Sequence, residues 1–381
     1  MLVAIALHLG TLVGTVLVGY FLLGAVAYLV YTPQTADERA DDTALVVTTV
    51  GADHVRDSLL ECLAHHREEF PDLDRYILTD EGADMEAELR AYEGYETVVV
   101  PDAFDCAAVA KGRAIQYFIE TVVADDPDRW YGFVDDDNLV QDDRFLYEIP
   151  YYDERGYGAM NSVLAPRKGE SVVTYVMDHV RLLDDLTVFR AFTGLLGRPY
   201  VGFHGELLTA RGDVLCDVGF DRHSIVEDFA FAAELVRADV RTWQSGTHVS
   251  ILSPHSLRDL FRQRSRWFVG TWNLLFDASP VTRLVTGVRL GSWVLAILAG
   301  PVSTVLWHTS TVSVPPVLQV APPLAGVVYG GTYLYGVAAA TLTDRRWAWL
   351  VVLLPLFALF EALAPVYAVL VSDREFTVIE K

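Results

Sequence analysis

Two features that often reveal a protein class are missing from this 381-residue chain. Its three cysteines, Cys62, Cys106 and Cys216, are widely spaced, which excludes a disulfide framework and a zinc site with closely spaced ligands. We expect each cysteine to be a small buried residue. No glycine-rich loop of the GxGxxG or GxxxxGKS/T kind follows an apolar run, so an ordinary dinucleotide-binding or P-loop domain is disfavoured.

Lysine is also scarce. Only three of the 29 basic residues are lysine, and the formal net charge is −22. A chain this acidic is not expected to bind nucleic acid or an anionic membrane surface. Concentrated salt screens the repulsion between surface carboxylates, so we predict a protein of an extreme halophile of the archaeal kind. An acidic protein from a GC-rich genome is the alternative.

Long runs without charge lie near both ends of the chain. The first thirty residues carry no charged side chain and exceed the ~20 residues that cross hydrocarbon. They lack the basic start of a secretory signal, so residues 1–31 are predicted to be a retained transmembrane anchor. Residues 284–372 are predicted to form three transmembrane helices, followed by a tail over 373–381. These spans are Leu290–Leu306, Leu324–Leu342 and Trp347–Val371.

Basic residues beside the expected spans predict the orientation. The segment Arg258–Arg266 and the pair Arg345-Arg346 should lie on the cytoplasmic side of the membrane. Four spans with an outside N-terminus satisfy both, and they leave the C-terminal tail outside. We therefore expect a multi-pass protein of the cell membrane with a cytoplasmic domain over residues 32–254.

The central domain alternates short apolar strands with helical segments. A helix is expected over Ala107–Val123, and strands are expected over Ala44–Val50, Tyr76–Thr79, Thr97–Val100 and Trp130–Val134. This alternation predicts an α/β fold, a mostly parallel sheet with helices on both faces. Such sheets bind ligands at the carboxyl ends of their strands, where Asp80 and Asp135–Asp137 stand.

Three consecutive carboxylates, Asp135 to Asp137, follow the fourth expected strand. They repel one another unless a cation lies between them. Hard oxygen ligands suit Mg²⁺ or Mn²⁺, which usually bind few carboxylates together with substrate phosphates. A solvated acidic turn that caps the next helix is the alternative.

Two further charged pairs stand at expected helix starts. Near Lys111 and Arg113 a diphosphate would meet both positive charge and the helix dipole, although plain surface charge is the alternative. Glu227 and Asp228 precede a strong helical run, and a carboxylate there can be only a helix cap. His204 follows an apolar segment expected to be a strand or its end, and a lone histidine is more often structural than a ligand.

A cationic aromatic cluster stands next to the C-terminal spans. Gln263, Arg266 and Trp267 are spaced i, i+3 and i+4, so a helix places them on one face. The surrounding segment, residues 255–283, has the arginine and aromatic residues of an interfacial helix at headgroup level. Together, the carboxylates, this cluster and the spans indicate an enzyme that handles a phosphorylated donor at a membrane.

The order of these clusters resembles that of the membrane-bound family 2 glycosyltransferases, the inverting GT-A class that includes cellulose, chitin and hyaluronan synthases. The matching motifs are Asp80, Asp135-x-Asp137, Val226-Glu227-Asp228 and Gln263–Trp267. A finer similarity to the egghead-type β-1,4-mannosyltransferases lies in Val47–Gly51, Lys111–Tyr117, His204–Leu207 and Ser224–Phe229. The resemblance covers about residues 44–275. This chain departs from the pattern with valine before Glu227-Asp228 and with Asp-Asp-Asp-Asn at the acidic motif.

The resemblance implies a role for each motif residue. Asp228, beside Glu227, would be the general base. Asp135 and Asp137 would bind the divalent cation, and His204, Gly205 and Trp267 would lie on the acceptor side. The implied donor site contains Asp80, Lys111, Arg113, Asp135, Gln263, Arg266 and Trp267.

The implied reaction transfers one hexose, of mannose or glucose type, with inversion and formation of a β-linkage. The donor would be GDP-mannose or a UDP-hexose, and the acceptor a lipid-linked or glycolipid molecule. A processive polysaccharide synthase is the alternative, although four spans are few for a polymer channel. An inactive membrane scaffold is a third reading, which the retained carboxylates disfavour.

Overall fold

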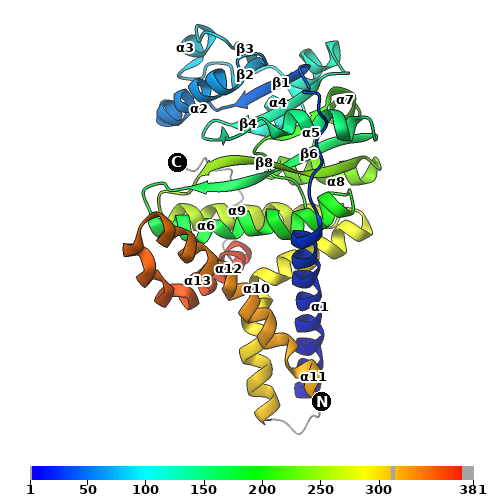
Figure 1. Ribbon diagram of the computed structural model, residues 1–381, viewed down its shortest axis with the longest axis vertical. Helices are drawn as coiled ribbons and strands as arrows, with labels where there is room; N and C mark the ends of the chain where they lie inside the picture. Colours follow the sequence, from blue (N-terminus) through cyan, green and yellow to red (C-terminus); the bar gives the residue numbers. More distant parts are fainter. Residues whose placement is uncertain (1, 310–313, 371–381) are drawn as a thin grey trace.

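The structure is a computed structural model that describes residues 2–309 and 314–370. The expected tail and the last residue of the final expected span lie outside the described residues. An α/β domain occupies one end of the molecule, and helices α1 (Leu2–Val30) and α10 (Pro280–Thr309) extend away from it (Figure 1).

The described chain forms one eight-stranded sheet with the order β3-β2-β1-β4-β7-β6-β8-β5. The first four strands in this order are parallel, as predicted, whereas β7 runs antiparallel to both β4 and β6. The strands are β1 (Thr43–Thr48), β2 (Asp74–Asp80), β3 (Glu96–Val100), β4 (Trp130–Asp135), β5 (Leu139–Val140), β6 (Tyr157–Arg167), β7 (Leu208–Arg211) and β8 (Arg241–Leu252).

Helices cover both faces of the sheet, as the alternation predicted. Alternate residues of the fully buried β1 point to opposite faces, so Leu45 joins one core cluster and Val46 the other. The domain helices are α2 (Arg56–Glu69), α3 (Glu86–Arg90), α4 (Lys111–Thr121), α5 (Arg144–Asp153), α6 (Val172–Asp184), the π-helix η3 (Asp185–Leu195), α7 (Gly212–Val218) and α8 (Glu227–Arg237).

Three local predictions were wrong. The helix expected from Ala107 begins at Lys111, because Ala110 has φ of 48° and so cannot continue a helix. The apolar segment before His204 is a loop instead of a strand, with φ of 97° at Gly202. Of the three cysteines, only Cys62 is buried. Cys106 is partly exposed, and Cys216 lies on the exposed side of α7.

Three helices of the described chain are long and apolar enough to cross a membrane, over Ala4–Val30, Pro280–Thr309 and Arg345–Leu370. The last combines the short helix η4 (Arg345–Leu353) with α13 (Leu354–Leu370). The fourth expected span forms α12 (Ala321–Thr343), preceded by α11 (Pro316–Gln319), but α12 is not among the three. Its prolines, glycines and tyrosines make it less apolar than the others.

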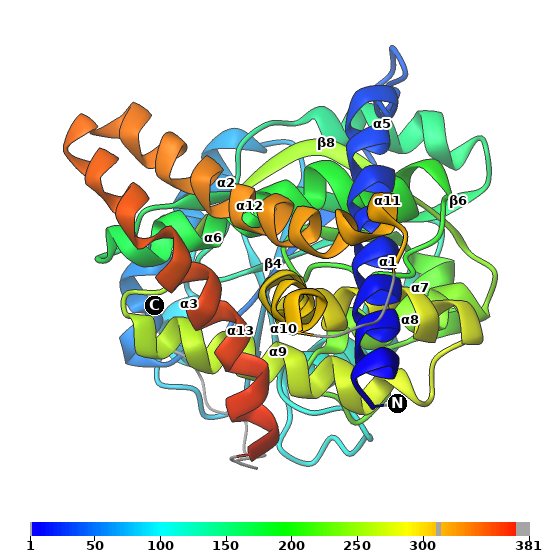
Figure 2. The ribbon, with the colours of Figure 1, turned by 90° about the horizontal axis from the view of Figure 1, so that it is seen from below.

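Helix α12 packs directly on the α/β domain. Seen from below, α12 and α13 cross the underside of that domain, where α6 and α9 (Leu257–Leu275) lie (Figure 2). A Cβ atom at Gly336 of α12 would lie 2.1 Å from the carbonyl oxygen of Val176 on α6, so only glycine permits this approach. The prediction of four spans is therefore supported for three helices, and α12 is also a docking element.

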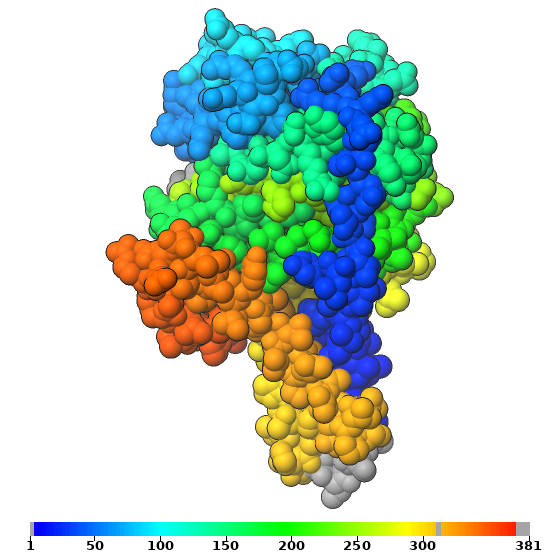
Figure 3. All heavy atoms as spheres, viewed as in Figure 1, coloured from blue at the N-terminus to red at the C-terminus, as the bar shows by residue number. Residues whose placement is uncertain are grey.

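The segment between α1 and β1 follows the surface of the α/β domain (Figure 3). Tyr31 Oη donates a hydrogen bond to the carbonyl of Gln244 at 2.7 Å, and Arg144 Nη2 donates to the carbonyl of Pro33 at 2.8 Å. Backbone bonds from Ala36 and Ala40 to α5 continue this attachment. The N-terminal helix is thus tied to the domain along its whole connection.

Candidate active site

Two adjoining cavities lie at the carboxyl ends of β1, β2 and β4. The first, which we call the sheet cavity, has a volume of about 210 Å³ and is lined by strand ends, α4 and α9. The second has a volume of about 200 Å³ and reaches from β4 to the helices outside the α/β domain. We call it the membrane-side cavity, because three of these helices are long and apolar enough to cross a membrane. The shared lining of the two cavities, which we call the junction, is Asp135, Ile225, Glu227, Gln263 and Arg266. Ligands in the two cavities can therefore meet at the junction.

Asp135 and Lys111 form an ion pair at the junction. Lys111 Nζ donates to Asp135 Oδ1 and, at 3.0 Å, to the carbonyl of Gly205, and it lies 3.9 Å from Glu227 Oε1. Burial alone lowers the pKa of Lys111, but the charges of Asp135 and Glu227 raise it above its usual value. The lysine therefore stays protonated and places a positive charge at the junction.

The acidic triplet lines the sheet cavity. Asp136 Oδ2 accepts a hydrogen bond from Thr49 Oγ1 at 2.7 Å, and Asp137 is 2 % exposed. Within residues 2–309 and 314–370, no group of three or more His, Cys, Asp or Glu side chains is arranged to hold a metal alone. Mg²⁺ and Mn²⁺ typically use few carboxylates and complete their shell with substrate phosphates. The carboxylates beside Lys111 fit a cation held in that shared way.

Asp80 ends β2 in the wall of the sheet cavity. Arg113 Nη1 donates to Asp80 Oδ1 at 2.9 Å, and its Nη2 donates to the carbonyl of Pro101 at 2.5 Å. Burial raises the pKa of Asp80, although the charge of Arg113 opposes the rise. Arg113 itself lines neither cavity, so it acts on the site through Asp80, and its direct contact with a diphosphate stays a prediction.

Glu227 and Asp228 begin α8 and line the membrane-side cavity. Burial and the charge of Asp228 raise the pKa of Glu227 to about 7, although Lys111 opposes the rise. Burial and the charge of Glu206 likewise raise the pKa of Asp228, which accepts the backbone N–H of Phe229 at 2.7 Å. A carboxylate whose pKa moves toward neutrality is a better proton acceptor, so this pair suits general-base chemistry.

The Gln-x-x-Arg-Trp residues lie on the cavity side of α9, as their spacing predicted. The helix begins after Ser256, whose side chain accepts the backbone N–H of Asp259. Gln263 and Arg266 line both cavities, and Trp267 lines the membrane-side cavity. Two other guanidinium groups, those of Arg181 and Arg264, lie 4.8 and 4.6 Å from the ring centroid of Trp267. Cation–π contacts thus restrain the tryptophan.

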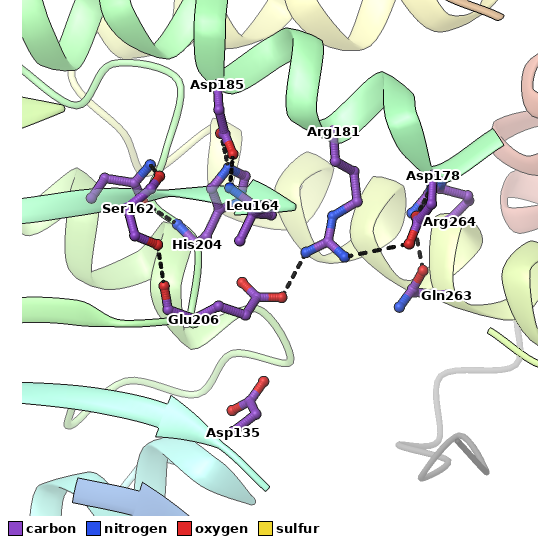
Figure 4. Close-up of polar contacts among 12 residues, drawn as sticks. Asp135, Ser162, Leu164, Asp178, Arg181, Asp185, His204, Glu206, Gln263 and Arg264 are labelled. Carbon is purple, nitrogen blue, oxygen red and sulfur yellow. Dashed lines mark hydrogen bonds and ion pairs between the residues drawn. The ribbon is translucent and has the colours of Figure 1, made fainter. Parts of the chain in front are cut away.

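The loop before β7 brings His204, Gly205 and Glu206 to the membrane-side cavity (Figure 4). The His204 imidazole is hydrogen-bonded through Nε2 to Asp185, and Arg181 Nη2 donates to Glu206 Oε1 at 2.6 Å. A Cβ at Gly205 would lie 2.7 Å from Lys111 Nζ, so glycine leaves the lysine its place. The structure therefore brings all three predicted acceptor-side residues, His204, Gly205 and Trp267, to one cavity.

Four helices outside the α/β domain complete the wall of the membrane-side cavity. Tyr20 belongs to α1, Trp293 to α10, Tyr333 to α12 and Glu361 to α13. The same cavity contains Asp228 of the α/β domain. A molecule held by these helices can therefore reach the carboxylates of the α/β domain.

Sequence reasoning missed several charged residues around the cavities. Glu206 stands inside the stretch His204–Leu207, and Arg264 stands inside the Gln-x-x-Arg-Trp segment, so both could have been found. Glu361 is the one charge within the last expected span, which is a signal by itself. Arg181 and Asp185 carry no sequence signal, because only the fold brings α6 and η3 beside this loop.

The chain matches the family model described as glycosyl transferase family group 2 over residues 132–362. The match includes the end of β4 with the acidic triplet, the Glu227-Asp228 pair and α9. The chain therefore belongs to this family and is a glycosyltransferase.

Two solved structures align with most of this chain. The mannosyltransferase PcManGT from Pyrobaculum calidifontis, in complex with GDP-Man and Mn²⁺, aligns with a TM-score of 0.53 and 12 % identity, over 94 % of this chain and 99 % of that one. Residues 1–349 of TarS from S. aureus, in complex with UDP-GlcNAc, align with a TM-score of 0.41 and 11 % identity, over 89 % and 95 %. The first likeness supports the GT-A fold. A comparison with curated proteins finds no match.

Proposed function

We propose that this glycosyltransferase moves one hexose from a nucleoside-diphosphate sugar to a lipid-linked or glycolipid acceptor, with inversion. The observation that carries this proposal is the composition of the membrane-side cavity, which combines Asp228 with side chains of four membrane-side helices. An acceptor anchored in lipid and held by these helices would meet the proposed base. A soluble acceptor would need no such wall.

The sheet cavity is the proposed donor site. Asp80 would contact the nucleotide base, and Asp135 the nucleotide portion. Lys111 would neutralise the diphosphate, with Gln263 and Arg266 closing over it at the junction. Because PcManGT forms a complex with GDP-Man, GDP-mannose is the first donor to test, with UDP-hexoses next. The egghead-type resemblance favours mannose and a β-1,4 linkage.

The acidic triplet is the proposed site of Mn²⁺ or Mg²⁺, held by Asp135 and Asp137. A bound cation would stabilise negative charge on the departing diphosphate. The chain's own residues would supply the rest of that stabilisation, since Lys111 is protonated and lies beside Asp135.

Asp228 is the proposed general base, with Glu227 beside it. Asp228 would take the proton of the acceptor hydroxyl as that oxygen forms its bond to the anomeric carbon and the bond to the diphosphate breaks. Attack on the face opposite the leaving group inverts that carbon, so an α-linked donor would give a β-linked product. The raised pKa of Asp228 strengthens it as a base.

The charges of the membrane-side cavity favour a hydroxyl nucleophile over a lipid phosphate. Four arginines line the cavity, against the six carboxylates of Asp135, Asp184, Glu206, Glu227, Asp228 and Glu361. Three of those arginines already contact lining carboxylates, in the pairs Arg181–Glu206, Arg264–Glu361 and Arg289–Asp184. A phosphate would meet excess negative charge, and being ionised it would need no base. The proposed acceptor is therefore a neutral sugar on a lipid.

The experiment supplies purified enzyme with Mn²⁺, a panel of GDP- and UDP-sugars, and two acceptors, an alkyl glycoside and a polyprenyl phosphate. We expect release of the nucleoside diphosphate with addition of one hexose to the alkyl glycoside, in β-linkage by NMR. Transfer to the polyprenyl phosphate alone would contradict the acceptor class. A long polymer would favour the processive synthase, and absence of donor cleavage with every sugar would contradict the function itself.

A further inference from the structure

A buried arginine connects the Gln-x-x-Arg-Trp helix to a membrane helix. Arg264 on α9 donates from Nε to Glu361 Oε1 on α13 at 3.1 Å, and from Nη2 to Asp178 Oδ1 on α6 at 2.7 Å. Its remaining nitrogen, Nη1, donates to Gln263 Oε1 at 3.0 Å. The side chains of Arg264, Asp178 and Glu361 are at most 7 % exposed. One guanidinium group is thus fixed at all three nitrogens.

We propose that Glu361 is a positioning residue for sugar transfer, although it lies in a helix apolar enough to cross a membrane. Together with Asp178 it fixes the guanidinium of Arg264, and Arg264 in turn fixes Gln263 and Trp267. This proposal rests on the proposed transferase function and adds a residue outside the α/β domain to it. Glu361 acts through Arg264 and is distinct from the proposed base and donor ligands.

Gln263 is the first side chain that this network orients. Its amide oxygen accepts the hydrogen bond from Arg264, so its NH₂ group is the end left to donate to a ligand. Gln263 is 3 % exposed and lines both cavities. An amide held in this orientation presents a hydrogen-bond donor at the junction, where donor oxygens and acceptor meet.

Trp267 is the second side chain that this network orients. The guanidinium of Arg264 lies 4.6 Å from its ring centroid, and that of Arg181 lies 4.8 Å away. Arg181 also pairs with Glu206, so the chain of contacts continues toward the loop of His204 (Figure 4). Displacing Arg264 would therefore loosen one wall of the membrane-side cavity as well as the junction.

Stability alone gives little reason for this network. Replacing a buried ion pair by apolar residues of similar volume is often neutral or stabilising, so such a pair is weak evidence for a stabilising role. An ionisable residue inside a membrane span usually has a function. In this proposal the function of Glu361 is to hold Arg264, which in turn orients Gln263.

The test compares purified Glu361→Gln and Asp178→Asn with the unmodified enzyme in the transfer assay described above. Phe360→Leu is the matched control, because Phe360 is the neighbour of Glu361 on α13 and packs on Phe261 of α9, with 5.1 Å between the ring centroids. We expect kcat for transfer to fall about tenfold to a hundredfold in the first two variants, since small displacements at a reacting centre cost this much. Donor affinity should stay within about twofold, and Phe360→Leu should transfer normally.

A second variant separates geometry from charge. Lysine keeps the charge of Arg264 but lacks the planar fork that contacts three partners at once, so Arg264→Lys should lose activity as Glu361→Gln does. Normal transfer by Glu361→Gln and Asp178→Asn, or by Arg264→Lys, would overturn the proposal while leaving the transferase function intact. If these variants fail to fold while Phe360→Leu folds, the network serves only stability and the proposal is wrong. Absence of transfer by the unmodified enzyme would instead refute the underlying function.

Discussion

At the scale of single residues, Asp228 has the environment of a base and also lies in the first turn of α8, where its side chain accepts the backbone N–H of Phe229. Asparagine has the same size, and its side-chain oxygen can accept the same hydrogen bond. Asp228→Asn should therefore fold and bind nucleotide sugar with near-normal affinity. It removes the proton acceptor, so kcat for transfer should fall by about 10²–10⁴-fold in a radiolabelled-sugar assay.

The control for this variant is Glu234→Gln on the same helix, where Glu234 pairs with Arg222 and Arg237 away from both cavities. It should transfer at the unmodified rate. Transfer by Asp228→Asn within a few-fold of the unmodified enzyme would mean that Asp228 only stabilises the first turn of α8. Loss of donor binding would mean that Asp228 is a donor-binding residue and not the base.

Glu227 should leave a pH signature on stability. Its pKa is raised to about 7 from 4.5, so between these values the folded protein binds more protons than the unfolded chain. Stability contributed by this group is complete below about pH 4.5 and is lost as pH rises toward 7. Glu227→Gln should therefore shrink the fall in Tm between pH 5 and pH 7.5.

The comparison for Glu227 is Glu68→Gln, which removes a carboxylate from the exposed surface of α2. This substitution corrects for the general repulsion among the many acidic groups. An equal change of the Tm difference in both variants would mean that Glu227 makes no special contribution.

At the scale of elements, the sequence predicted the first half of the sheet and not the second. The strands β1 to β4 are apolar runs that are buried on the sheet, which is the pattern a parallel strand requires. In contrast, β6 and β8 bury polar residues, and some of these hydrogen-bond from one strand to the other. Asn161 Nδ2 donates to Gln244 Oε1 at 3.0 Å, and Gln244 Nε2 donates to the carbonyl of Ser162 at 2.6 Å. A sequence does not reveal a hydrogen-bond partner about eighty residues away, so no strand was predicted for either segment.

The same limit applies to the candidate site. Asp80, Asp135 and Glu227 stand at recognisable strand ends or at a helix start, and Gln263 was predicted from its spacing to Arg266 and Trp267. The network of Asp178, Arg264 and Glu361 joins three helices that are far apart in the sequence. Only the packing of α6, α9 and α13 brings these charges together.

The docking of α12 on α6 gives a prediction at the element scale. A methyl group at Gly336 would lie 2.1 Å from the carbonyl oxygen of Val176, so Gly336→Ala should force the helices apart. Overpacking of this kind typically costs about 1–3 kcal/mol, and Tm should fall. Gly330→Ala is the control on the same helix, because its Cβ would meet nothing within 4 Å. It should leave Tm unchanged or raise it, and equal Tm values for the two variants would contradict the close packing.

At the scale of the whole molecule, the net charge of −22 predicts a response to salt. Repulsion among carboxylates opposes the compact state, and the Debye length falls to about 3 Å near 1 M salt. The Tm of the purified protein should therefore rise between dilute and molar KCl. A Tm that is unchanged or lower in molar KCl would count against adaptation to salt, and the acidic composition would need another origin.

The orientation of the molecule in the membrane can be tested with its own cysteines. Cys216 on α7 is exposed and belongs to the α/β domain, whereas Cys62 is buried. Because the arginines of α9 adjoin the spans, the proposed orientation places this domain in the cytoplasm. A membrane-impermeant maleimide should then label the protein only after the cells are opened. Cys216→Ser should remove most of that label, and the remainder should come from Cys106, which is partly exposed. Labelling of Cys216 in intact cells would reverse the orientation and place the nucleotide-sugar site outside, where the proposed donor is not made.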